Sequence, residues 1–157
     1  MRRSGNYLLF LRAAIDRVYS AGMQETDVPE QPLISIVDDD EFMRDSIRQL
    51  VKSLGYAVAS FSSAMAFLKS PDLEQTACLI ADVQMPGMTG DELYGRLVHD
   101  GRTVPTILIT AYPDNHLRTR VLNDGVFCYL HKPFDEHSLI NCVRKAVDGT
   151  CPGANDP

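Results

Sequence analysis

The feature that most constrains this chain is a regular alternation of short apolar runs with amphipathic segments. Five runs are apolar and too short for helices, which predicts strands at 34–37, 57–59, 78–81, 104–109 and 126–130. After each run, apolar residues recur every three or four positions, which is typical of a helix that faces a core. The runs are continuous rather than alternating, so we expect parallel strands with both faces of the sheet covered.

Five strands that are each followed by a helix predict a doubly wound α/β domain over residues 33–148. We expect Gly55 to end the first helix, and Ser62 to cap the second. The helices are expected at about 43–54, 62–69, 91–99, 114–123 and 135–147. Their inward side chains should be Met43, Ile47, Leu50, Val51 and Leu54, then Leu93, Tyr94, Leu97 and Val98, and finally Leu139, Ile140, Val143 and Val147.

Residues 1–32 differ in character from the domain and are interpreted as an N-terminal extension. Apolar residues between Leu8 and Val18 fit one face of a short helix, and the polar stretch 25–32 should be a flexible linker. The helix could bind a partner or a membrane surface, or it could be an appendage of little function. An upstream start is a further alternative, because Met23 would open a more compact chain. Residues 149–157 form a tail, in which we expect no second domain.

Composition narrows the classes of function. The chain has 157 residues, of which 45% are hydrophobic and 23% charged, as in ordinary globular domains. A net charge of −6 without a basic block argues against nucleic-acid binding. No apolar run approaches the roughly 20 residues of a membrane span. The four cysteines lack CxxC spacing, so we expect reduced thiols in a cytoplasmic protein, without a disulfide or zinc.

Polar residues follow four of the predicted strands. Asp38 and Asp39 follow the first, Asp82 the third, Thr110 the fourth and Lys132 the fifth. Because parallel strands present their C-terminal ends at one edge, where open α/β sheets bind ligands, these side chains should converge. The neighbouring acidic residues at 40 and 41 are better explained by a helix N-terminus, which favours negative charge.

Three close carboxylates repel one another, and a hard divalent cation would relieve that repulsion. Oxygen ligands favour Mg²⁺ or Ca²⁺ over zinc, and a shallow site with few carboxylates favours Mg²⁺. An aspartate can also attack phosphorus and form an aspartyl phosphate. We therefore interpret Asp82 as a phosphate-accepting nucleophile, with Lys132 and the Thr110 hydroxyl as groups that stabilise the transferring phosphoryl group.

Four motifs in this order resemble the receiver domain of bacterial two-component response regulators. They are Val37-Asp38-Asp39, Asp82-Val-Gln-Met-Pro-Gly-Met-Thr-Gly90, Ile109-Thr110-Ala111 and Lys132-Pro133-Phe134. The resemblance implies a flavodoxin-like (βα)5 fold with strand order 2-1-3-4-5. It also implies a stand-alone phosphoacceptor protein of a two-component phosphorelay, in which Asp82 receives a phosphoryl group in a Mg²⁺-dependent reaction.

The resemblance further implies a role for each residue of the site. Asp39 would bind Mg²⁺ directly and Asp38 largely through water, and the metal would also be bound by Asp82 and the Gln84 backbone carbonyl. Lys132 would contact the phosphate. Thr110 and Tyr129 would form a switch pair, in which the hydroxyl moves toward phosphate while the aromatic ring turns inward.

The implied partners are a histidine kinase or histidine phosphotransfer protein and a downstream protein target, without direct DNA or membrane binding. The signalling surface would be formed by 114–123, 126–130 and 135–147, which could also form a homodimer. Phosphorylation would be self-catalysed, so the chain would not be an enzyme with turnover. An aspartate-nucleophile phosphatase is less favoured, because Gln84 stands where such enzymes carry a proton-donating aspartate. A degenerate receiver that acts as a constitutive docking module is a further alternative.

Overall fold

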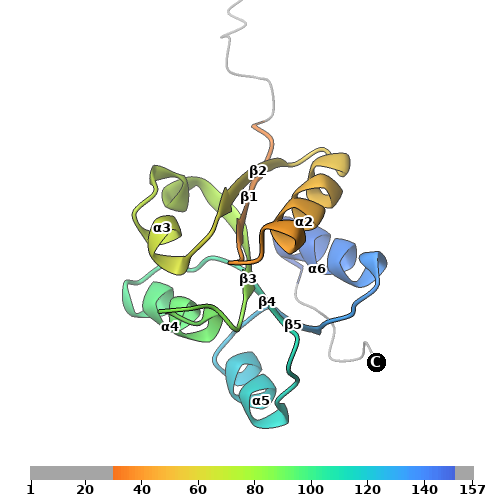
Figure 1. Cartoon of the computed structure of the whole chain (residues 1–157). Coiled ribbons are helices and arrows are strands. Elements are labelled where there is room, and N and C mark those ends of the chain that lie inside the picture. Colours follow the sequence, from red (N-terminus) through yellow and green to blue (C-terminus); the bar gives the residue numbers. More distant parts are fainter. Residues whose placement is uncertain (1–29, 151–157) are drawn as a thin grey trace, which may run out of the picture. The chain divides into compact units, whose positions relative to one another are not determined.

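The computed structural model describes residues 30–150, which contain a five-stranded parallel sheet (Figure 1). Its strands lie in the order β2-β1-β3-β4-β5. Their bounds are β1 (Leu33–Val37), β2 (Ala57–Phe61), β3 (Thr76–Asp82), β4 (Thr106–Thr110) and β5 (Cys128–His131). All four neighbouring pairs are parallel. The predicted doubly wound sheet and its strand order are confirmed.

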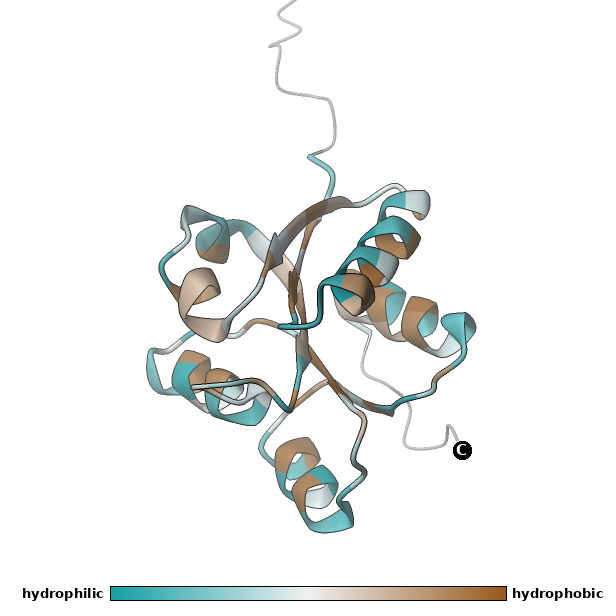
Figure 2. Cartoon of the chain, viewed as in Figure 1, coloured by the Kyte–Doolittle hydropathy of each residue, from teal (hydrophilic) through white to brown (hydrophobic). Residues whose placement is uncertain are grey.

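Helices cover both faces of this sheet. One face packs against α2 (Glu41–Ser53) and α6 (Glu136–Asp148), and the other against α3 (Ala64–Leu68), α4 (Gly90–His99) and α5 (Asn115–Asn123). Figure 2 shows the apolar strands in the centre and polar residues on the outer sides of the helices. The sheet therefore separates two apolar cores, as the continuous hydrophobic strands predict. The largest fully buried side chains are Phe67, Ile34, Ile36, Leu79, Ile80, Leu93, Leu97, Ile107, Leu108, Ile109, Leu139 and Val37.

Side-chain caps fix where the helices begin. Asp114 and Asp135 accept hydrogen bonds from the first turns of α5 and α6, close to the predicted helix starts. In α4, Thr89 and Glu92 form a reciprocal capping box. The cap of α3 is Ser63, so the prediction of Ser62 was wrong by one residue.

Three further local details differ from the sequence prediction. A short 3₁₀ helix, η1 (Pro71–Gln75), precedes β3 and was not predicted. Val98 was expected to face inward but is 51% exposed, because Leu93 and Leu97 define the core side of α4 and Val98 lies about 100° away from Leu97. β4 begins at Thr106 rather than at 104, since Pro105 has no N–H to donate to a ladder.

Two of the cysteines differ from the sequence prediction. Cys128 and Cys142 form a disulfide, so the prediction of reduced thiols was wrong for this pair. The packing of α6 against the sheet brings their Cα atoms to 6.4 Å, within the range that a disulfide spans. A separation of 14 residues gives no hint of this contact in the sequence. Cys78 is free and fully buried, while Cys151 lies outside the described residues.

The predicted N-terminal helix through Leu8–Val18 also lies outside the described residues and stays a prediction, as do the linker before Glu30 and nearly all of the tail. Within residues 30–150, no helix combines the length and apolar character that crossing a membrane requires.

Candidate functional site

Three carboxylates meet at the C-terminal edge of the sheet. Asp82 is the last residue of β3, and Asp38 directly follows β1. One oxygen from each of Asp38, Asp39 and Asp82 lies within 4.8 Å of the others. Asp38 is 2% exposed and Asp82 8% exposed, whereas Asp39 is exposed to solvent. The structure thus brings together the three carboxylates that the sequence placed after separate strands.

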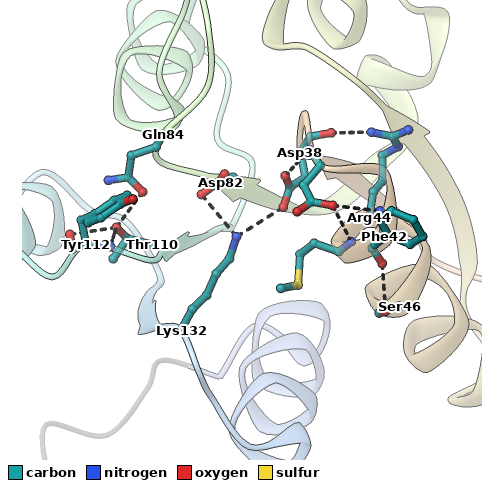
Figure 3. Close-up of polar contacts among 11 residues, drawn as sticks. Asp38, Phe42, Arg44, Ser46, Asp82, Gln84, Thr110, Tyr112 and Lys132 are labelled. Carbon is teal, nitrogen blue, oxygen red and sulfur yellow. Dashed lines mark hydrogen bonds and ion pairs between the residues drawn. The ribbon is translucent and has the colours of Figure 1, made fainter.

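Lys132 reaches this cluster from the segment after β5 (Figure 3). Its Nζ lies 3.6 Å from Asp38 Oδ2 and 3.7 Å from Asp82 Oδ1. Its backbone N–H donates a 2.7 Å hydrogen bond to the Thr110 carbonyl, and the following bond to Pro133 is cis. Lys132 is therefore held at the end of the sheet by its backbone and points its ammonium between two carboxylates.

The cluster is negatively charged, and burial makes that charge costly. The pKa of Asp82 is raised to about 6, chiefly by burial and also by the nearby Asp38 and Asp39 carboxylates, while Lys132 and the Gln84 backbone N–H oppose the rise. Burial also raises the pKa of Asp38. The Asp40 N–H, which donates a 2.9 Å bond to Asp38 Oδ1, and Lys132 counteract this effect. The cluster thus holds three carboxylates, of which Asp38 and Asp82 lie near the Lys132 ammonium.

The donor set fits a hard cation. Asp82 Oδ1 is buried, and although Lys132 lies nearby, the oxygen has no hydrogen-bond partner among the described residues. Leaving a buried acceptor unpaired is unfavourable, so a ligand that binds this oxygen would stabilise the site. Asp38, Asp39 and Asp82 supply only oxygen atoms, which suits Mg²⁺ or Ca²⁺. These three side chains are the residues that could hold such an ion.

A second polar group surrounds the hydroxyl of Thr110, the last residue of β4 (Figure 3). Thr110 Oγ1 lies 2.9 Å from Gln84 Oε1 and 2.9 Å from the Tyr112 carbonyl oxygen. It accepts a 3.1 Å hydrogen bond from the Tyr112 N–H. Because a hydroxyl has one proton to donate, the two acceptors compete for it. The predicted metal contact of the Gln84 backbone carbonyl stays a prediction.

Tyr129 lies on β5 beside Leu108 of β4. Its ring packs against the core that contains α4 and α5, on the opposite side of the sheet from Cys128. The phenol oxygen is buried without a hydrogen-bond partner within the described part of the chain. The ring is thus turned inward in this structure, while its predicted role as a switch residue remains untested.

Two contacts of the site were not foreseen from the sequence. Arg44 on α2 donates a 2.6 Å hydrogen bond from Nη1 to the Asp38 carbonyl. This bond helps to fix the backbone that carries Asp38 and Asp39. The Gln84 side chain contacts Thr110 across the edge of the sheet. Neither has a signal in the sequence, because each depends on how a helix or loop folds over a strand end. Asp40 has the structural role expected of it, since it caps α2.

Comparison with known proteins identifies the family. The model of the response regulator receiver domain matches residues 34–144. The chain belongs to this family. The receiver is 35% identical to the response regulator protein TmoT of Ectopseudomonas mendocina over 118 residues, which cover 75% of this chain and 54% of TmoT. It is 34% identical to the transcriptional regulatory protein FixJ of Azorhizobium caulinodans over 120 residues, which cover 76% of this chain and 57% of FixJ.

A solved receiver from Burkholderia phymatum is similar in both sequence and structure. It is 36% identical to this receiver with a TM-score of 0.66, and the match covers 78% of this chain and 99% of the other. The chain spans about half the length of the curated relatives it matches. The comparisons therefore establish the fold and family of residues 34–144. They do not assign the activities of the longer relatives to this chain.

Proposed function

We propose that this receiver accepts a phosphoryl group on Asp82 from the phosphohistidine of a histidine kinase or a histidine phosphotransfer protein. The observation that carries the proposal is the cluster at the end of β3, where Asp82 lies beside two further carboxylates and a lysine. Membership of the receiver family supports the same assignment. The positions of these groups matter because catalysis of phosphoryl transfer depends mainly on positioning the reactants and neutralising their charge.

Asp82 is suited to act as the nucleophile. Within residues 30–150 its Oδ1 has no hydrogen-bond partner to displace, and with a pKa of about 6 the carboxylate is largely ionised at neutral pH. In the proposed step, a carboxylate oxygen forms a bond to phosphorus while the phosphorus–nitrogen bond of phosphohistidine breaks. The imidazole leaves with the bonding electron pair and takes a proton from solvent water, so that it departs as neutral imidazole.

The neighbouring side chains stabilise the negative charge of the transferring group. The Lys132 ammonium lies next to Asp82 and would pair with a phosphoryl oxygen. The Thr110 hydroxyl would donate to another oxygen once it leaves Gln84 or Tyr112.

A Mg²⁺ ion belongs to the same proposal. Asp39 would bind it directly, Asp38 largely through water, and Asp82 and the Gln84 backbone carbonyl would complete the protein ligands. When bound, the ion neutralises charge on the carboxylates and on the transferring phosphoryl group. Two observations support this assignment: the buried Asp82 oxygen has no hydrogen-bond partner in the described part of the chain, and the donor set consists of oxygen atoms.

We further propose that the receiver holds phosphate as a signal and does not turn over a substrate as an enzyme. Its only reactions would be self-catalysed transfer to Asp82 and slow self-dephosphorylation. The amide of Gln84 cannot act as a proton donor for a leaving group in the way a carboxylic acid can. Instead its side chain contacts Thr110, which links the site to the proposed switch.

The proposed output is a change in protein contacts in the cytoplasm. Movement of Thr110 toward phosphate would change the packing next to β5, where the Tyr129 ring lies against the core and its hydroxyl has no hydrogen-bond partner among the described residues. The affected surface would comprise α5, β5 and α6, and it would bind a downstream protein target or a second copy of this receiver. Direct DNA or membrane contact is not part of this proposal.

The test is phosphorylation with acetyl phosphate and Mg²⁺, followed by intact mass and peptide mapping. We expect the wild type to gain one phosphoryl group on Asp82 and the Asp82→Asn variant to gain none. The exposed residue Asp148 supplies the control, because Asp148→Asn removes an aspartate that lies outside the cluster. Equal modification of wild type and Asp82→Asn would overturn the phosphoacceptor assignment and favour a constitutive docking module.

A further inference from the structure

The disulfide between Cys128 and Cys142 has no place in the proposed phosphoryl transfer, yet it spans the segment that carries Lys132. Cys128 opens β5 at the edge of the sheet and is partly exposed, while Cys142 on α6 is 8% exposed. Their Cα atoms are 6.4 Å apart, so the bond can form between these two elements as they are packed. The bond therefore ties an edge strand to the helix that follows it.

The geometry of β5 relates this bond to the site. Side chains alternate along a strand, and Cys128 and Leu130 face α6 while Tyr129 faces the opposite core. The segment between the two cysteines includes Lys132. Closing the bond fixes both ends of that segment, and Lys132 extends from it toward Asp82 (Figure 3).

We propose that Cys128 and Cys142 form a reversible thiol oxidation site that reacts with low-molecular-weight disulfides, and that the closed bond restrains the segment holding Lys132. The second part rests on the proposed phosphoacceptor function, and the first does not. A disulfide in a protein of the cytoplasm is usually transient or redox-sensing, because cellular thiols keep cysteines reduced there.

The reaction balances as two thiol–disulfide exchanges. The Cys128 thiolate, the more exposed of the two, attacks one sulfur of the small disulfide, whose sulfur–sulfur bond breaks and releases one small thiol. The Cys142 thiolate then attacks Cys128 Sγ in the mixed disulfide and releases the second small thiol. Two cysteine thiols are oxidised, one small disulfide is reduced to two thiols, and the two cysteine protons pass to the small thiols. Excess small thiol reverses both steps.

Cys78 shows what an unreactive thiol looks like in the same domain. It is fully buried, and burial raises its pKa to about 12, so almost no thiolate forms at neutral pH. Cys128 differs because it is partly exposed and lies on an edge strand of the sheet. The partner for the second exchange, Cys142, lies beside it.

The first experiment counts thiols and measures stability of the full chain. The protein is equilibrated with reduced or oxidised glutathione, unfolded, alkylated and mapped by mass spectrometry. We expect Cys128 and Cys142 to be blocked only after oxidation, with an unfolding constant about 100-fold smaller in the oxidised form. Cys151→Ser should behave like the wild type, whereas Cys142→Ser should lose the stability difference. Free thiols at both positions after oxidation, or pairing with Cys151, would overturn the site.

The second experiment tests the link to Lys132. We expect amide exchange over residues 129–141 to slow several-fold in the oxidised wild type, with no change over 57–68. Beryllofluoride, a phosphoryl mimic, should bind the oxidised form several-fold more tightly in the presence of Mg²⁺, because less ordering of the segment is needed. Equal affinity would overturn the link to Lys132. Loss of beryllofluoride binding in both forms would instead overturn the phosphoacceptor proposal, and the thiol site would still be judged by alkylation.

Discussion

Replacing Asp82 with asparagine should stabilise the metal-free protein at neutral pH. The side chain is 8% exposed, lies beside two other carboxylates and has one oxygen without a hydrogen-bond partner among the described residues. Asparagine keeps the shape of the side chain and removes its charge. Lys132 keeps an ion-pair partner in the variant, because its Nζ also lies 3.6 Å from Asp38.

The magnitude follows from the pKa of Asp82, which rises from 3.8 to about 6 on folding. Because the folded-state pKa is higher, protonation favours the folded state. The stabilisation from the protonated side chain is fully present below pH 3.8 and is lost as the pH rises through about 6. Each tenfold change in the acidity constant corresponds to about 1.4 kcal/mol, so ionisation of Asp82 lowers the free energy of unfolding by at most about 3 kcal/mol at pH 8. The asparagine variant does not carry this cost.

Urea unfolding in EDTA, monitored by circular dichroism from pH 4 to pH 8, measures the difference. We expect Asp82→Asn to match the wild type near pH 4 and to exceed it by about 1–3 kcal/mol at pH 8. Adding Mg²⁺ should stabilise the wild type more than the variant and narrow the gap. The reasoning is refuted if the variant is no more stable than the wild type at pH 8, or if the gap does not shrink toward pH 4. Asp148→Asn should show no comparable pH dependence.

Three further predictions concern the surroundings of Asp82. Gly90→Ala should destabilise the protein by about 2 kcal/mol or more in urea unfolding, because the added Cβ would overlap the Asp82 carbonyl. Gly95→Ala in the same helix is the control: a Cβ added there would meet no atom within 4 Å, so this variant should be neutral or stabilising. Arg44→Ala should weaken Mg²⁺ binding by about 10-fold in calorimetry through loss of its bond to the Asp38 carbonyl, and an affinity equal to that of Arg48→Ala would contradict this role. Thr110→Ala should still be phosphorylated but should lose the accompanying change around Tyr129, and unaltered partner binding by the phosphorylated variant would count against the switch.

The strands and helix starts of this receiver were largely predictable, because local sequence patterns determine them. The β1 and β3 strands read as short continuous apolar runs, and parallel strands necessarily bring their C-terminal ends to one edge. That rule places Asp38 and Asp82 at the same edge although their numbers differ by 44, and the strand order implied by the resemblance makes their strands neighbours. Helix caps at Asp114 and Asp135 were equally predictable, since a short acceptor before an amphipathic segment satisfies free backbone N–H groups.

Tertiary packing decided the contacts that no local pattern encodes. The disulfide depends on how closely α6 packs on β5, and the bond from Arg44 to the Asp38 carbonyl depends on how α2 folds back over the end of β1. The sequence by itself determined which groups gather at the edge of the sheet, because its continuous apolar runs predict parallel strands whose C-terminal ends meet there. The order of the strands was implied by the resemblance to the receiver family. Only the tertiary structure decided which atoms touch and which oxygen of Asp82 lacks a hydrogen-bond partner among residues 30–150, because distances of a few ångströms are set by the packing of entire elements.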